Sequence, residues 1–104
     1  MDSPFLIRQL GETLAAPESG KLSQVLVDDE HAKVMLMAFA AGAGLPEHVS
    51  PLPAILQIVH GEAELTVGDQ AVAGRPGTWI RMAPNTPHSI LARTPVHLLL
   101  ALLK

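Results

Sequence analysis

The chain has no cysteine and no tyrosine, and its only aromatic side chains are Phe5, Phe39 and Trp79. Without cysteine it can form no disulfide, no thiolate nucleophile and no cysteine-type zinc site. Three scattered aromatic residues cannot form the stacking platform that single-stranded nucleic acids require. There is no basic run, and the net charge of −3 and pI near 5.9 argue against a nucleic-acid partner.

Charge is also scarce, because only 16% of the 104 residues are charged whereas 48% are hydrophobic. Globular domains usually carry about 25% charged residues. The apolar surplus must be buried, and an interface between two copies is an economical place for it, so we expect a homodimer. The apolar run Leu98–Leu103 is too short to span a bilayer, and Met1–Pro4 does not begin a signal peptide. We therefore expect a cytoplasmic protein without a membrane partner.

The length predicts a single domain over residues 1–104, made of an N-terminal extension (1–20) and a barrel (22–104). Within residues 4–16, Leu6, Ile7, Leu10 and Leu14 have helical spacing, which predicts a short helix that Gly11 weakens.

Strand signals dominate after residue 20. Short apolar or alternating segments recur at intervals of roughly ten residues with Gly or Pro between them, which is typical of an all-β sandwich or barrel. The predicted strands are 22–27, 32–40, 54–59, 62–67, 70–73, 78–82, 88–92 and 96–102. Gly68-Asp69 fits a two-residue hairpin turn.

Two glycine- and histidine-containing segments carry the most specific signal. In the first segment, five residues separate Gly42 from His48. Ser50 and Ala54 follow His48, and Gly61 closes the segment. In the second, Gly77 is followed by Ala83, Asn85, His88 and Ala92.

These segments resemble the paired motifs of the cupin superfamily, G-(x)5-H-x-H-(x)3–4-E-(x)6-G and G-(x)5-P-x-G-(x)2-H-(x)3-N. The resemblance covers residues 22–104 and implies a jelly-roll (double-stranded β-helix) barrel of the RmlC-like type, as in small single-domain bacterial cupins. In metal-binding cupins three histidines and one glutamate hold the metal. Here only His48 and His88 are retained, whereas Ser50 and Ala54 occupy the second histidine and glutamate positions.

The resemblance places His48 and His88 together in the mouth of the barrel, where they are candidates to bind a ligand or one divalent transition metal (Fe, Mn, Ni, Zn or Cu). Ser50 is a further candidate ligand contact. Gln57 could supply an amide oxygen, although it lies three residues beyond the glutamate position and so on the other face of a regular strand.

Three functions are consistent with these residues. The first is a cupin with a degenerate two-histidine site that binds a small molecule in an aliphatic cavity. The second is a metal-dependent enzyme, an oxygenase or isomerase of a small organic acid or sugar, in which water or substrate completes the ligand set. The third is a structural or regulatory dimer whose barrel is filled by side chains. Whether the chain is an enzyme, and which small molecule it binds, stay open at this point.

Overall fold

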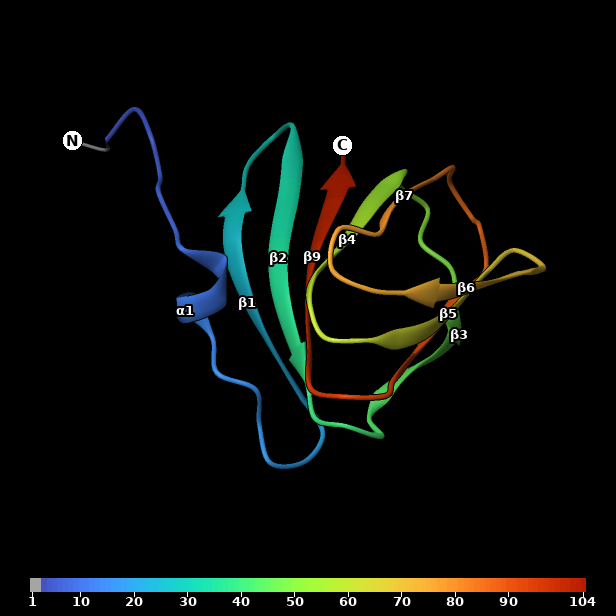
Figure 1. Ribbon diagram of the computed structural model, residues 1–104. Helices are drawn as coiled ribbons and strands as arrows, with labels where there is room; N and C mark the ends of the chain where they lie inside the picture. Colours follow the sequence, from blue (N-terminus) through green and yellow to red (C-terminus); the bar gives the residue numbers. More distant parts are fainter. Residues whose placement is uncertain (1–2) are drawn as a thin grey trace.

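The structure is a computed structural model that describes residues 3–104, and it consists of two antiparallel β-sheets and one helical turn (Figure 1). This confirms the predicted all-β fold. The elements are α1 (Leu10–Thr13), β1 (Lys21–Asp28), β2 (Ala32–Phe39), β3 (Gly44–His48), β4 (Ala54–His60), β5 (Ala63–Val67), β6 (Gln70–Gly74), β7 (Trp79–Met82), β8 (His88–Ala92) and β9 (Val96–Leu103).

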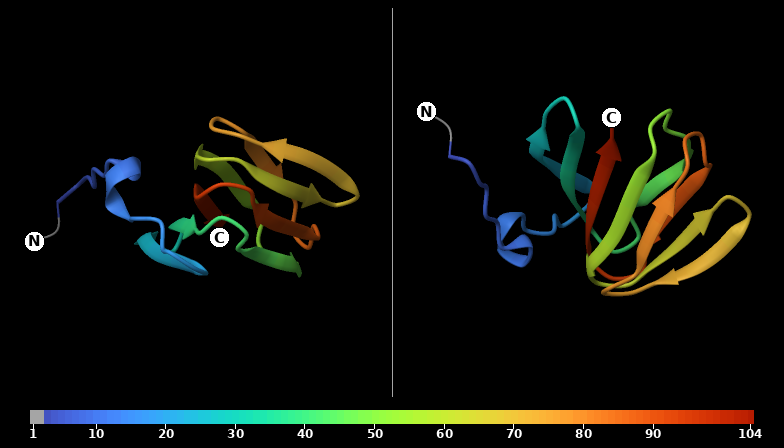
Figure 2. Two further views of the ribbon diagram at one scale, coloured as in Figure 1. Left: turned by 60° about the horizontal axis from the view of Figure 1, so that its bottom comes forward. Right: turned by 90° about the horizontal axis from the view of Figure 1, so that it is seen from above.

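The strands form a five-stranded sheet in the order β1-β2-β9-β4-β7 and a four-stranded sheet in the order β3-β8-β5-β6. Their inner faces pack against each other, as in a jelly roll, and the two sheets are not joined into one closed cylinder. The strands of the four-stranded sheet lie across one half of the larger sheet, which leaves β1 on the other side of the molecule (Figures 1 and 2).

The connections between strands define two ends of the barrel. Residues 40–43, 61–62, 75–78 and 93–95 connect strands at one end, which we call the closed end. Residues 29–31, 49–53, 68–69 and 83–87 connect strands at the opposite end, which we call the mouth. His48 ends β3 and His88 begins β8, so both histidines lie at the mouth.

On β9 and β5 the inner side chains are less buried at the mouth than at the closed end. Along β9 the inward residues Val96 and Leu98 are inaccessible, whereas Leu100 and Leu102 are only partly buried. On the facing sheet, Leu65 of β5 is buried and Val67 is only partly buried. Aliphatic side chains therefore fill the closed end. At the mouth Val67, Leu100 and Leu102 are partly accessible, whereas Ala54 and Met82 stay buried.

One strand was not predicted from the sequence. No strand was predicted between residues 40 and 54, but His48 belongs to β3, which contains Pro46. Proline lacks a backbone N–H, and a strand at the edge of a sheet tolerates it because one side of that strand needs no donor.

The helix predicted within residues 4–16 is reduced to the single turn α1. Gly11 lies inside it, no side chain caps its first residue, and none of its residues is buried, so neither local propensity nor packing extends it. The segment is held to the barrel through His97, a mostly buried residue of β9 whose Nε2 atom lies 2.6 Å from the carbonyl oxygen of Leu14. Met1 and Asp2, which begin the predicted extension, lie outside the described residues. Across residues 3–104, no helix is long and apolar enough to cross a membrane.

The glycine that closes the first motif has a packing function at the closed end. Gly61 has φ of 87°, a conformation that other residues rarely adopt. A Cβ atom at this position would also overlap the carbonyl oxygen of Pro95 in the neighbouring connection. Both constraints require glycine here.

We therefore expect Gly61→Ala to lower the free energy of unfolding by at least about 2 kcal/mol, because it combines an unfavourable φ with a backbone clash. Urea denaturation followed by circular dichroism measures the change. Gly11→Ala is the matched control, since it has open space around it and should leave stability unchanged or slightly raised. Equal effects of the two substitutions would contradict this account.

Candidate functional site at the mouth of the barrel

The two retained histidines are in contact. His48 and His88 are directly opposite each other on neighbouring strands of the four-stranded sheet. Their ring centroids are 4.1 Å apart and the ring planes are tilted by 56°. His48 is exposed and His88 is partly buried. The structure thus brings together the two residues that the sequence motif had singled out.

Backbone carbonyl groups orient both rings in the same way. Nδ1 of His48 lies 2.8 Å from the carbonyl oxygen of Pro46, and Nδ1 of His88 lies 2.9 Å from that of Thr86. A carbonyl oxygen can only accept a hydrogen bond, so each Nδ1 carries the hydrogen. In the neutral rings each Nε2 is then left with its lone pair, which can accept a hydrogen bond or bind a cation.

Ser50 connects the two loops that flank the histidines. Its hydroxyl oxygen accepts a hydrogen bond of 3.2 Å from the backbone N–H of Leu52. Its carbonyl oxygen accepts one of 2.7 Å from the backbone N–H of Asn85 in the other loop. Asn85 has φ of 62°, which asparagine adopts more readily than most residues. Ser50 therefore supports the mouth through its backbone and side chain.

The glutamate position of the family motif is apolar and enclosed. Ala54 is 3% exposed and lies between Met82 and Leu102 on the two adjacent strands. Gln57 lies on the opposite face of β4, where it is exposed and pairs with Trp79 and Leu99. The structure does not bring Gln57 to the histidines, because the interior face of β4 is formed by Ala54, Leu56 and Ile58.

The donor set does not fit the four-ligand metal site that the cupin resemblance implies. Residues 3–104 contain no group of three or more His, Cys, Asp or Glu side chains that could hold a metal ion. No carboxylate is grouped with the two imidazoles, so a divalent cation there would lack both ligands and charge compensation.

Two further residues lie in line with His48 and His88 across the four-stranded sheet, and they were not predicted from the sequence. His88 is opposite Val67 on β5, and Val67 is opposite Gln70 on β6. The hairpin turn at Gly68-Asp69, which the sequence did predict, sets this register and could have placed both. Val67 and Gln70 also line a cavity of about 450 Å³ between β6 and β7, together with Val72, Thr78, Trp79, Ile80 and Arg81.

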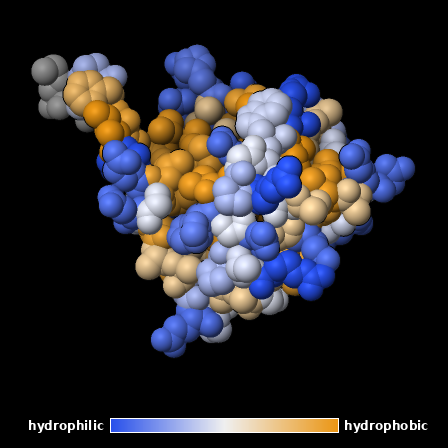
Figure 3. Space-filling model, in the orientation of Figure 1, coloured by the Kyte–Doolittle hydropathy of each residue, from blue (hydrophilic) through white to orange (hydrophobic). Residues whose placement is uncertain are grey.

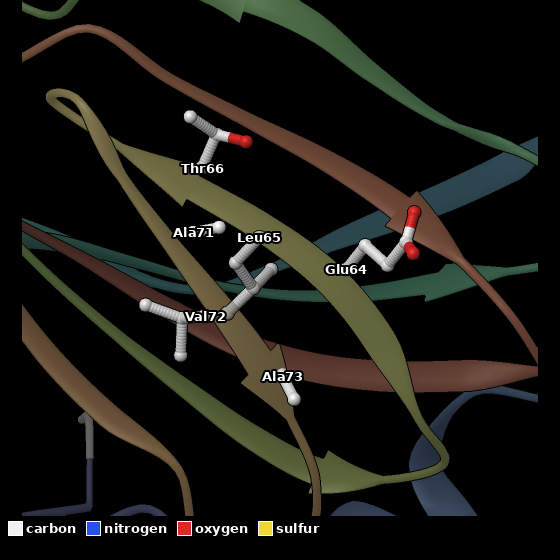
Figure 4. A pocket seen from close by; sticks show the side chains of 6 residues that line it. All are labelled: Glu64, Leu65, Thr66, Ala71, Val72 and Ala73. Atoms are coloured by element: carbon white, nitrogen blue, oxygen red, sulfur yellow. The ribbon is translucent and has the colours of Figure 1, made fainter.

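A second hollow lies on the outer surface of the four-stranded sheet and is separate from the histidines. Its volume is about 400 Å³, and it is lined by Glu64, Leu65, Thr66, Ala71, Val72 and Ala73. Figure 4 shows Glu64 and Thr66 projecting from β5, with the short side chains of Ala71 and Ala73 on β6 beside them. The lining contains no imidazole, and we do not include this hollow in the candidate site.

Comparison with known proteins agrees with the fold. The family model of the cupin domain matches residues 35–102, which is most of the chain, so the chain belongs to the cupin family. No curated protein matches it.

Solved structures with the same fold come from several bacteria. A conserved protein of unknown function from Streptococcus pyogenes has a TM-score of 0.86 at 23% identity, covering 100% of this chain and 90% of that one. A cupin superfamily protein from Desulfitobacterium hafniense has a TM-score of 0.85 at 21% identity, covering 99% and 94%. An RmlC-like cupin from Desulfovibrio desulfuricans has a TM-score of 0.79 at 23% identity, covering 99% and 96%. At these identities the likeness shows the fold alone.

The hydrogen bond of the Ser50 hydroxyl predicts a structural effect of its removal. We expect Ser50→Ala to lower the free energy of unfolding by about 1 kcal/mol, because the N–H of Leu52 loses its acceptor. Urea denaturation measures the loss. Gln57→Ala is the control, because Gln57 lies on the exposed outer face of β4, and it should change the free energy of unfolding by less than about 0.5 kcal/mol. A larger loss for Gln57→Ala than for Ser50→Ala would contradict the assignment.

Proposed function

We propose that the chain binds a small organic molecule at the mouth of the barrel, with His48 and His88 as its polar anchors. The observation that supports the proposal is the orientation of the two rings, which contact each other and leave an Nε2 lone pair on each. They lie at the end of the barrel where the inner side chains of Val67, Leu100 and Leu102 are partly accessible. A ligand entering there would meet both imidazoles.

The chemistry of the mouth favours a ligand with hydroxyl groups and an apolar body. Two neutral imidazoles in this tautomer present two acceptors, which a ligand's hydroxyl groups can satisfy by donating hydrogen bonds. The partly buried residues at this end are aliphatic, among them Val67, Leu100 and Leu102. They provide apolar contact area, whereas the few polar groups set the orientation, as is usual in small-molecule sites.

Catalysis by a bound metal is the alternative, and the residues at the mouth support it less well. Mononuclear metal sites in enzymes usually have three or more protein ligands. Here two nitrogens are available, and the enclosed methyl group of Ala54 stands where a carboxylate would be needed. Any further ligand would have to come from water or from the bound molecule.

Titration of the untagged protein with a panel of polyols, sugars and hydroxy acids tests the proposal. We expect one compound class to shift the imidazole Nε2 resonances of His48 and His88 in ¹⁵N NMR. Substitution of either histidine by alanine should weaken binding about tenfold, as expected for the loss of one hydrogen bond. His60→Ala is the control, because His60 is exposed and ends β4 at the closed end.

Elemental analysis of the same preparation, before and after incubation with Fe, Mn, Ni, Zn or Cu, separates the two functions. Close to one metal per chain, lost in the His48→Ala/His88→Ala variant, would overturn simple ligand binding and favour the metal-dependent enzyme. Binding that survives loss of both histidines would place the ligand elsewhere.

A further inference from the structure

A lateral opening separates the two sheets along one side of the barrel. β7 is the last strand of the five-stranded sheet and β6 is the last strand of the four-stranded sheet. The cavity of about 450 Å³ lies between these two edge strands. Figure 3 shows apolar surface among polar residues on the side of the molecule where β6 and β7 lie. The opening differs from the histidine site, because neither His48 nor His88 lines the cavity.

Inner side chains of both sheets form the apolar part of this cavity. Val67 and Val72 belong to the four-stranded sheet and Ile80 belongs to the five-stranded sheet. All three are partly buried and pack against the main core. An apolar group that entered between the two edge strands would therefore extend the core, and removal of apolar surface from water favours its binding.

Two side chains of β7 add an aromatic and a cationic group to the cavity. Trp79 and Arg81 both line it, and they are two residues apart, so they share the face of β7 opposite to Ile80. Trp79 is 58% exposed, which leaves much of its large ring available for contact. Within residues 3–104, no carboxylate lies within ion-pair distance of Arg81. Its positive charge is thus available to a ligand.

The charges around the cavity favour an anion with a single negative charge. Among the described residues that line it, Arg81 is the only cation and none is an Asp or Glu. The planar guanidinium group matches the two oxygens of a carboxylate, whereas a doubly charged phosphate would keep one charge without compensation. The hydroxyl of Thr78 accepts a hydrogen bond of 3.0 Å from the backbone N–H of Arg75 and can still donate its own hydrogen.

We propose that the cavity between β6 and β7 binds a small organic carboxylate with an apolar body. Its carboxylate pairs with Arg81, and its apolar body lies beside Trp79 and between the two strands. The cavity of about 450 Å³ is toward the lower end of the range of small-molecule sites, which suits such a ligand better than a protein segment. The inference goes beyond the proposed function at the mouth and does not depend on it.

Trp79 is the only tryptophan of the chain, so its fluorescence reports directly on the cavity. Hexanoate is the probe, acetate is the carboxylate without an apolar body, and 1-hexanol is the apolar body without a charge. We expect hexanoate to change the emission saturably with a Kd of about 1 mM, and both partial probes to bind about tenfold more weakly. The indole N–H resonance of Trp79 in ¹⁵N NMR should shift over the same range of concentration.

Substitution of the arginine tests the charge contact. Arg81→Gln should weaken hexanoate binding about tenfold, to the level of 1-hexanol, and Arg81→Lys should keep part of the affinity because it keeps the charge. Arg8→Gln is the matched control. It removes the same charge from an exposed residue before α1, whose side chain donates a hydrogen bond to the carbonyl oxygen of Ile7. It should leave the Kd for hexanoate unchanged.

Several results would overturn the proposal. One is the absence of a saturable change in both signals up to about 50 mM hexanoate. Another is an equal loss of affinity in Arg81→Gln and Arg8→Gln, because binding would then follow net charge alone. The His48→Ala/His88→Ala variant should bind hexanoate as the wild type does. Loss of binding in that variant, with none in Arg81→Gln, would move the carboxylate from this cavity to the mouth.

Discussion

The pairing of β9 with both β2 and β4 holds the five-stranded sheet together, and the rest of the structure depends on it. β9 is in register with β2 along its full length and with β4 over most of its length. Its inward residues Val96 and Leu98 are inaccessible at the closed end, where they pack in the same cluster as Phe39, Ile58 and Ala92. This aliphatic packing occupies the closed end of the barrel, whereas Leu100 and Leu102 of the same strand are partly accessible at the mouth.

The mouth is built by two loops whose contacts are mostly made by backbone groups. Pro46 and Thr86 each present a carbonyl oxygen to a histidine ring, and Ser50 joins the loop after β3 to the loop before β8. Such contacts set ring orientation without using charge. The same contacts would also orient the rings toward a metal, but Ala54, at the glutamate position of the family motif, presents only a methyl group.

The apolar side chains of the interior are covered, whereas some of those on the outer surface are not. Inside, the side chains of both sheets fill one continuous core. On the N-terminal side, apolar residues of the segment before α1 (residues 3–9) and of β1 are exposed, with no covering element within the described part of the chain. This asymmetry is consistent with the low fraction of charged residues, since a chain with few charges has fewer ways to make an unpartnered surface polar.

Much of the fold could be predicted from the sequence. The spacing of Gly42, His48, Gly61, Gly77 and His88 indicated the cupin barrel, and eight of the strands followed from apolar runs and Gly or Pro punctuation, because alternation and turn chemistry are local properties. β3 was missed because an edge strand with a proline has no such pattern. The predicted helix was too long, because helical spacing identifies an apolar face but does not show whether another element packs against it. Only the tertiary structure decided that both Nδ1 atoms are hydrogen-bonded to carbonyl groups, that Ser50 links two loops and that residues 3–9 stay exposed. Each carbonyl group lies two residues before its histidine, so that contact depends on how the backbone bends there, whereas the bond between Ser50 and Asn85 joins segments distant in the chain. The pattern of residue types encodes neither of them.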